Sequence, residues 1–294
     1  MKTIKLFAMM LVALVGMTAC SSDDDNETKK NVIDPVEGLK GYIFVSSGYF
    51  KDSYYGDQAT LSVKVKDNQY TITFHDPQWG DVDFENVAID EAKNTVSGAG
   101  TLKMNYRGKD GSYDAVLSGD VNNPTITMPD VMGGTTISFF KGDAPLACQL
   151  QGNYSGSTSV MVGDSYGPYT ADFTSKVTAN PDGTINVEIP EHVLEGTAIG
   201  DLTLGKVTIK NVYYDSAKED FCYPYGKLQK EMIMHFKAER EGTVTMDGDY
   251  NFSENSEIEV KQTASGIQMI NRFQLGKMPF PIVATFEGVI PSEK

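Results

Sequence analysis

Cysteine and histidine are the side chains best suited to nucleophilic chemistry or metal binding, and this chain has three of each. The histidines, His75, His192 and His235, are far apart and show neither the HxH nor the HExxH spacing that places two imidazoles on one zinc ion. Cys148 and Cys222 could form a disulfide in an oxidising compartment, or remain buried thiols. These residues therefore predict no metal site and leave the disulfide open.

Two signatures of common enzyme classes are missing from the sequence. It contains no phosphate-binding Walker loop, and no His with a nearby Ser and acid in a recognisable order. Counting alone does not exclude a carboxylate pair for glycoside hydrolysis, although most carboxylates of so acidic a chain are solvated. Asp247-Gly248-Asp249 has calcium-ligating residue types but lacks the full loop with its terminal Glu. We therefore expect a protein that is not an enzyme and that needs no cofactor.

The remaining cysteine, Cys20, follows a segment typical of a secretory signal peptide. Lys2 and Lys5 are basic, and Leu6 to Val15 is an almost unbroken apolar run. This run is shorter than the ~20 apolar residues that a transmembrane helix needs. The pattern predicts a signal peptide over residues 1–19.

Met17-Thr18-Ala19-Cys20 resembles the lipobox of bacterial lipoproteins, which are cut before a cysteine that carries diacylglycerol. Thr18 and Ala19 fit that motif, while Met17 stands where the family usually has Leu. The resemblance implies that Cys20 is lipidated, and several acyl chains would anchor the protein stably, whereas one chain binds a membrane only marginally. The alternative is an ordinary signal peptide with Cys20 as an unmodified thiol.

Residues 20–38 are polar and charged, which predicts a flexible acidic tether. Within it, Ser21-Ser22-Asp23-Asp24-Asp25 resembles the acidic export signal of lipoproteins displayed on the outer face of Gram-negative outer membranes. That resemblance implies an outer membrane lipoprotein exposed at the cell surface. The alternative is a solvated spacer with no targeting role.

The net charge of −15 limits the range of partners. An acidic surface repels phosphate backbones and anionic lipid surfaces alike. We therefore expect no nucleic-acid partner, and contact with the membrane through the lipid anchor only.

From Gly41 onward, apolar and polar residues alternate with the period of β-strands. Leu61-Ser62-Val63-Lys64-Val65, the turn at 66–69, and the alternating Tyr70, Ile72 and Phe74 predict a hairpin with one buried face. Further strands of the first half are expected at Gly41–Phe50, Asp83–Ile89, Thr95–Tyr106, Tyr113–Asp120 and Thr135–Phe140.

The second half repeats landmarks of the first half in the same order. The hairpin at 61–74 has its counterpart at 173–189. This order predicts two diverged copies of one β-domain, at 39–143 and 150–291. The other matched pairs are Gly41-Tyr42 with Gly152-Asn153-Tyr154, Gly80-Asp81-Val82 with Gly200-Asp201-Leu202, Ser118-Gly119-Asp120 with Asp247-Gly248-Asp249, and Ile137–Phe140 with Val283–Phe286.

Short strands separated by turns every ~8–12 residues are typical of an antiparallel barrel or sandwich. Gly152-Asn153-Tyr154-Ser155-Gly156, Asn180-Pro181-Asp182-Gly183 and Ile199-Gly200-Asp201 resemble the calycin-like β-barrel domains of secreted bacterial lipoproteins. The resemblance covers 150–290 best and the first copy more weakly. It implies an all-β chain of two tandem antiparallel, calycin/lipocalin-like barrels without catalytic residues. Ile267 to Pro281 departs from the pattern and is expected to form a plug, a lid or a short helix.

Aromatic residues in predicted loops are the candidates for binding. Trp79 could stack on a sugar ring or anchor a partner, or it could close one end of the barrel as part of the core. Tyr213, Tyr214, Tyr223 and Tyr225 could contact a glycan or a protein, or pack at the mouth of the barrel.

Two functions follow from these features. The first is a non-enzymatic cell-surface lipoprotein that binds a small apolar or mixed ligand inside a barrel, because eight strands leave room for one small ligand. The alternative is a surface adhesion or scaffold module that contacts glycan or protein through its aromatic loops. A filled barrel interior would count against the first, and burial of the aromatic rings against the second.

Overall fold

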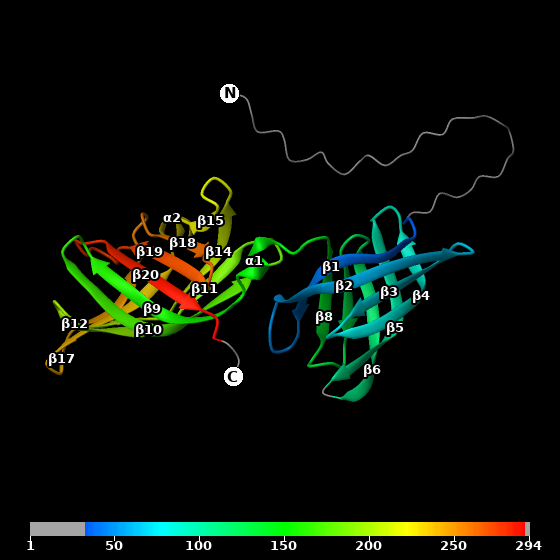
Figure 1. Ribbon diagram of the computed structural model, residues 1–294, viewed down its shortest axis with the longest axis horizontal. Coiled ribbons are helices and arrows are strands. Elements are labelled where there is room, and N and C mark those ends of the chain that lie inside the picture. Colours follow the sequence, from blue (N-terminus) through cyan, green and yellow to red (C-terminus); the bar gives the residue numbers. More distant parts are fainter. Residues whose placement is uncertain (1–32, 107, 292–294) are drawn as a thin grey trace, which may run out of the picture. The chain divides into compact units, whose positions relative to one another are not determined.

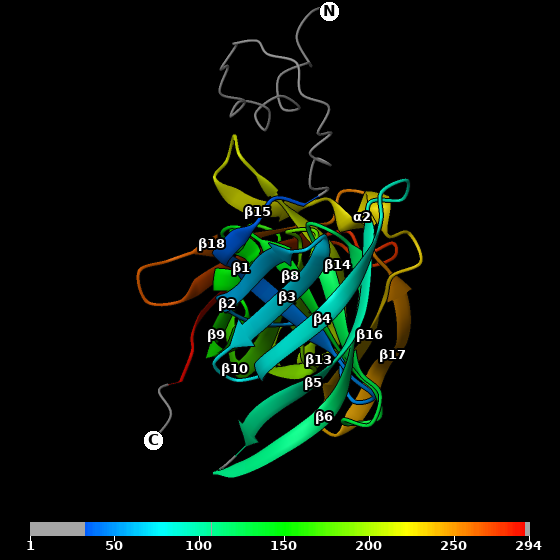
Figure 2. The same ribbon diagram turned by 90° about the vertical axis from the view of Figure 1, so that its right-hand side faces the viewer.

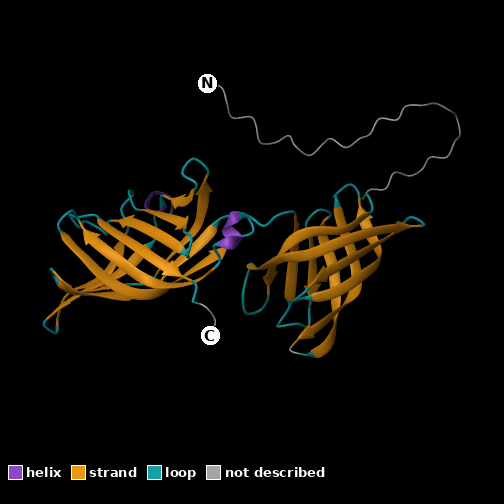
Figure 3. Cartoon of the chain, in the orientation of Figure 1, coloured by secondary structure: helices purple, strands orange, loops and turns teal. Residues whose placement is uncertain are grey.

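The computed structural model describes residues 33–106 and 108–291, most of which lie in strands (Figure 3). The predicted signal peptide, Cys20 and most of the predicted tether lie outside this range. Within it, the chain forms twenty strands and two four-residue helices, α1 (Leu146–Gln149) and α2 (Tyr225–Leu228). Among the described residues, no helix has the length and hydrophobicity to cross a membrane.

Residues 36–141 form a closed barrel of eight antiparallel strands, each paired with the next along the chain (Figures 1 and 2). The barrel closes where β1 pairs with β8, from Gly41 opposite Lys141 to Ser46 opposite Thr136. Its strands are β1 (Val36–Ser46), β2 (Ser53–Lys66), β3 (Gln69–Asp76), β4 (Gly80–Asp90), β5 (Thr95–Tyr106), β6 (Lys109–Asp120), β7 (Pro124–Met128) and β8 (Thr135–Lys141).

The β2–β3 hairpin shows how the sequence pattern produces this barrel. Leu61 lies opposite Phe74 and Val63 opposite Ile72, and all four side chains are buried. The two turn residues, Asp67-Asn68, have φ angles of 51° and 65°. Two successive positive φ angles define the type I′ turn, whose twist matches that of the paired strands. The predicted hairpin is confirmed.

The second closed barrel has the strand order β9-β10-β11-β14-β15-β18-β19-β20, and β20 pairs back with β9. The predicted fold class of two tandem antiparallel β-barrels is therefore confirmed. The strands of the second barrel are β9 (Gly152–Val162), β10 (Tyr166–Ala179), β11 (Ile185–Ile189), β14 (Val207–Asp215), β15 (Asp220–Tyr223), β18 (Glu257–Gln262), β19 (Ile267–Phe273) and β20 (Ile282–Val289).

Two insertions in the second barrel form an extra sheet of four strands. It has the order β12-β13-β16-β17, with β12 (His192–Thr197), β13 (Gly200–Leu204), β16 (Ile233–Arg240) and β17 (Thr243–Asn251). Leu194, Leu202 and Phe236 from this sheet are buried in the same apolar core as the barrel strands. The sheet therefore packs on the second barrel.

This arrangement confirms part of the predicted repeat and corrects the rest. The hairpins at 61–74 and 173–189 are the second and third strands of their barrels, and β8 and β20 are both final strands. However, Gly200-Asp201-Leu202 lies on β13 and Asp247-Gly248-Asp249 on β17, both in the extra sheet. Those two matches to barrel strands were wrong. The expected plug, lid or helix at 267–281 is instead strand β19 followed by a loop.

Candidate binding site

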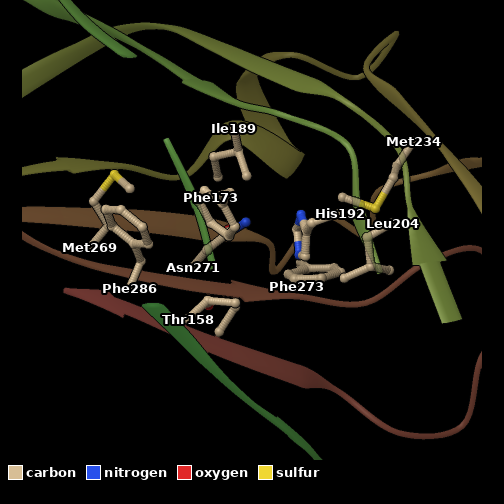
Figure 4. A pocket seen from close by; sticks show the side chains of 11 residues that line it. Thr158, Phe173, Ile189, His192, Leu204, Met234, Met269, Asn271, Phe273 and Phe286 are labelled. Atoms are coloured by element: carbon tan, nitrogen blue, oxygen red, sulfur yellow. The ribbon is translucent and has the colours of Figure 1, made fainter. Parts of the chain in front are cut away.

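A small void lies within the second barrel (Figure 4). Its volume is about 20 Å³, which is enough for about one water molecule. Side chains from the barrel and from the extra sheet point toward it. It is lined by Thr158, Phe173, Ile189, His192, Leu204, Met234, Met269, Asn271, Phe273, Ala284 and Phe286.

Aromatic packing closes this void. The rings of Phe173 and Phe286 are stacked with centroids 4.7 Å apart, and the ring of His192 lies 4.7 Å from that of Phe173. Burial lowers the pKa of His192, and its Nδ1 lies 3.0 Å from the carbonyl oxygen of Pro190. Asn271 is 4% exposed and accepts a hydrogen bond from the hydroxyl of Tyr225.

This void is too small for the ligand that the sequence led us to expect inside the barrel. Ligand pockets typically enclose ~300–1,000 Å³. In the first barrel, large side chains such as Phe74, Phe84 and Phe139 are fully buried and fill the interior. A ligand inside the second barrel would require the stacked rings to separate.

A larger depression, which we call the α1 groove, lies between α1, the β14–β15 hairpin and β18. Its volume is about 300 Å³. Phe221 and Val260 lie opposite each other on paired strands, and Leu146 and Leu150 come from α1 and its C-terminal end. The full lining is Leu146, Leu150, Tyr214, Glu219, Asp220, Phe221, Val260, Lys261 and Gln262. One part of the groove is therefore apolar and another part is charged.

Asp220 is the unusual charged residue of the α1 groove. Only 7% of its side chain is exposed, and Oδ2 lies 3.6 Å from Nζ of Lys261. Its Oδ1 is buried and has no hydrogen-bond partner among the described residues. Buried carboxylates are normally paired and hydrogen-bonded because removal from water is costly.

One of the predicted binding tyrosines, Tyr214, lines this groove, while Tyr213 and Tyr223 lie on the same two paired strands, β14 and β15. Tyr213 and Tyr214 are 43% and 41% exposed. The ring of Tyr213 packs edge-on against Tyr223 at 5.8 Å, and that of Tyr214 against Phe221 at 5.4 Å. Tyr214 is therefore the predicted tyrosine that the structure brings to the α1 groove, and binding by Tyr213 and Tyr223 stays a prediction.

The structure places the other two aromatic candidates in the core. Trp79 is 7% exposed, and its ring packs edge-on against Tyr55 at 5.5 Å. Tyr225 is fully buried, donates a hydrogen bond of 2.7 Å to Oδ1 of Asn271, and has its pKa raised by burial. Neither ring is available to a partner, which corrects their assignment as binding residues.

Cys148 and Cys222 are both buried, free thiols, so the suggested disulfide is absent. Their surroundings differ. Burial raises the pKa of Tyr42 and Tyr54 in the first barrel, and Cys148 adds a smaller contribution in the same direction. Burial likewise raises the pKa of Cys222, against a smaller opposing effect of Lys218. Within the described ranges, no group of three or more His, Cys, Asp or Glu side chains could hold a metal ion.

Sequence reasoning did not identify Asp220, Lys261, Leu146 or Leu150 as site residues. Asp220 lies in Ala217-Lys218-Glu219-Asp220, which looks like an ordinary solvated turn. Its burial depends on the pairing of β15 with β18, which is 35 or more residues further along the chain. No local signal in the sequence indicates that contact.

Comparisons with known proteins agree with this fold. Residues 150–289 match the calycin-like beta-barrel domain family, which accounts for the second barrel and its inserted sheet. No curated protein matches the chain significantly.

Four solved chains match this one significantly, and two of them are as follows. A candidate outer membrane protein from Bacteroides fragilis NCTC 9343 is 21% identical, with a TM-score of 0.57, covering 86% of this chain and 96% of its own. A protein of unknown function from the DUF3598 family of Nostoc punctiforme PCC 73102 is 13% identical, with a TM-score of 0.22, covering 85% and 94%. The first of these supports the fold over both barrels.

Proposed function

We propose that this protein is a non-enzymatic lipoprotein of the outer membrane that binds a small ligand of mixed polar and apolar character in the α1 groove. The single observation that carries the proposal is the contrast between two spaces. The groove offers about 300 Å³, whereas the void inside the second barrel offers about 20 Å³. Of these two spaces, only the groove is large enough for a small ligand. The depressions of about 580 Å³ along β1 and β2 and of about 490 Å³ along β9 and β10 are larger but more open to solvent.

The lining of the groove suits a mixed ligand. Leu146, Leu150 and Val260 would cover an apolar part of the ligand, and Tyr214 adds a partly exposed ring. Glu219 and Gln262 supply polar contacts at the charged part. Convergent polar groups on an apolar wall are typical of sites that orient small molecules.

The anchor supports a role in binding rather than catalysis. Lipidation at Cys20 would hold the barrels at a membrane, and the acidic segment after it favours display on the cell surface. The structural neighbour from Bacteroides fragilis, itself described as a candidate outer membrane protein, is consistent with this location. The GxSxG spacing at residues 163–167 lies in the β9–β10 hairpin and not in the strand-to-helix turn that a nucleophile elbow requires, so a displayed barrel fits capture of a ligand better than hydrolysis.

The neutral fluorescent dye Prodan tests the proposed site. We expect saturable binding of one dye per chain, measured by its blue-shifted emission, with a Cys20→Ser chain purified without detergent. Tyr214→Ala, in the groove, should weaken binding about tenfold or more, because truncating an aromatic anchor removes much of a site's energy. Phe286→Leu, at the interior void, is the matched control and should bind as the wild type does.

The opposite pattern, with Phe286→Leu weakened and Tyr214→Ala unchanged, would place the ligand inside the barrel. Absence of saturable binding would contradict a ligand site in the groove. Location is tested separately by protease shaving of intact cells with a periplasmic marker as control. A fully protected protein would rule out surface display.

A further inference from the structure

We propose that the α1 groove selects ligands that carry a primary ammonium group, with the carboxylate of Asp220 as the counter-ion. This inference rests on the proposed function, because it assigns a chemical class to the ligand of the same site. The ligand would be a small organic amine with an aliphatic or aromatic body. The argument depends on the incomplete pairing of Asp220, the charge of the lining, and the apolar wall.

The contacts of Asp220 leave it able to accept a strong hydrogen bond. Oδ1 has no partner in the described part of the chain, and the contact between Oδ2 and Lys261 is 3.6 Å, which is too long for a hydrogen bond. The torsion about the Cβ–Cγ bond of aspartate is broad, so a small rotation can turn an oxygen toward the groove. An ammonium group supplies up to three N–H donors to such a carboxylate.

The charges around the groove favour a cation. Glu219 and Asp220 carry two negative charges, against one positive charge on Lys261. Asp215, the cross-strand neighbour of Asp220, adds another carboxylate on the same hairpin. An anionic ligand would meet like charges here, whereas an ammonium would complete the pairing of Asp220.

Lys261 would compete with the ligand for Asp220. Its side chain is 57% exposed, so its ammonium can remain in water when a ligand displaces it from the carboxylate. The loss of this ion pair is offset because the ammonium group of the ligand replaces that of Lys261 beside the buried carboxylate. Loss of the Asp220 carboxylate should therefore weaken binding of the amine, whereas loss of the Lys261 ammonium should strengthen it.

The rest of the groove defines the body of the ligand. Leu146, Leu150 and Phe221 form an apolar wall, and Tyr214 presents a ring that is 41% exposed. Ammonium groups also interact favourably with aromatic faces. A ring or short alkyl chain attached to the ammonium would cover this wall within the available space of about 300 Å³.

The test uses three probes of similar shape: phenethylamine, phenethyl alcohol and hydrocinnamate, which are cationic, neutral and anionic at pH 7. Binding to the Cys20→Ser chain would be measured by isothermal titration calorimetry and by changes in NMR chemical shifts. We expect phenethylamine to bind at least about tenfold more tightly than the alcohol, as a charge-assisted hydrogen bond allows. Hydrocinnamate should bind more weakly than either.

Three variants separate the ion pair from structural damage. Asp220→Asn should abolish the preference for the amine, and Lys261→Met should strengthen its binding. Asp130→Asn removes one charge from an exposed position in the first barrel and should change nothing. Circular dichroism checks that each variant folds. If Asp220→Asn does not fold, the effect of Lys261→Met on amine binding still decides the test.

Equal binding of the amine and the alcohol, or binding of the amine that both groove variants leave unchanged, would overturn the role of Asp220. Prodan binding that depends on Tyr214 would still support the groove in that case. If neither Prodan nor any of the three probes binds, both the groove and its selectivity fail.

Discussion

The hydroxyl of Tyr225 donates a hydrogen bond of 2.7 Å to Oδ1 of Asn271, and both side chains are buried. Tyr225 belongs to α2, in the segment between β15 and β16, while Asn271 belongs to β19 of the barrel wall. The bond therefore ties the connection to the extra sheet to the second barrel.

Tyr225→Phe should destabilise the second barrel. The substitution keeps the ring but leaves Oδ1 of Asn271 buried without its donor, which costs about 1–3 kcal/mol. Urea denaturation, followed by circular dichroism, measures the loss. Tyr213→Phe at an exposed position is the control, with an expected change within about 0.5 kcal/mol. Equal effects of the two variants would contradict this role for the hydrogen bond.

His192 should make stability depend on pH. Burial lowers its pKa in the folded protein, so the unfolded chain binds a proton more readily. Its contribution is fully present above the unfolded pKa of ~6.5 and is lost as the pH falls toward the lower folded pKa. We therefore expect the urea concentration at the midpoint of unfolding to decrease as the pH is lowered from 7.5 to 5.5.

The His192→Gln variant should lose the part of the pH dependence of stability that protonation of His192 causes. His75→Gln is the matched control, because His75 is exposed and pairs with Asp81. The prediction fails if His192→Gln retains the same slope between pH 7.5 and 5.5 as the wild type. It also fails if only the His75 variant alters that slope.

The fold was largely predictable because alternation marks strands and glycine and asparagine mark turns. The β2–β3 hairpin, with its Asp67-Asn68 turn, is a local pattern that needs no tertiary information. The strands of the extra sheet alternate in the same way, so Gly200-Asp201-Leu202 on β13 resembled a barrel strand. Pairing partners depend on contacts distant in the sequence, and a single sequence does not record them.

The site was predictable only in part. Tyr213 and Tyr214 were identified because aromatic residues in a polar hairpin are conspicuous, and they are exposed. Trp79 was placed in the same class, yet its ring is buried against Tyr55. The sequence does not distinguish Asp220 from the many other acidic residues of this chain, because only tertiary packing buries its side chain. Composition therefore indicates which residues are candidates, while burial decides between them.

Gly156→Ala should destabilise the closure of the second barrel. Gly156 on β9 lies opposite Gly288 on β20, and an added Cβ would approach the backbone oxygen of Glu287 to 1.9 Å. Backbone must shift to relieve that overlap, and overpacking of this kind costs about 1–3 kcal/mol or more. Thermal unfolding measures the effect.

The matched control is Gly248→Ala on β17 of the extra sheet. An added Cβ there would meet only the ring of Tyr250 at 3.6 Å or more, which is ordinary contact. The thermal unfolding midpoint of Gly248→Ala should stay close to that of the wild type. If Gly156→Ala melts at the same temperature as Gly248→Ala, the close approach of β9 and β20 is not tight enough to exclude a methyl group.

Cys148 and Cys222 should resist modification while the protein is folded. Burial raises the pKa of the Cys148 thiol to about 11 and also raises that of Cys222. The thiolate is the reactive form, so a raised pKa together with burial slows alkylation. In the Cys20→Ser chain at pH 8, iodoacetamide should label neither thiol appreciably in buffer and both in urea. Mass spectrometry without reductant counts the added groups.

Two outcomes would contradict this prediction. A disulfide would leave both cysteines unlabelled in urea until a reductant is added. Rapid labelling in buffer would contradict the burial of the thiols.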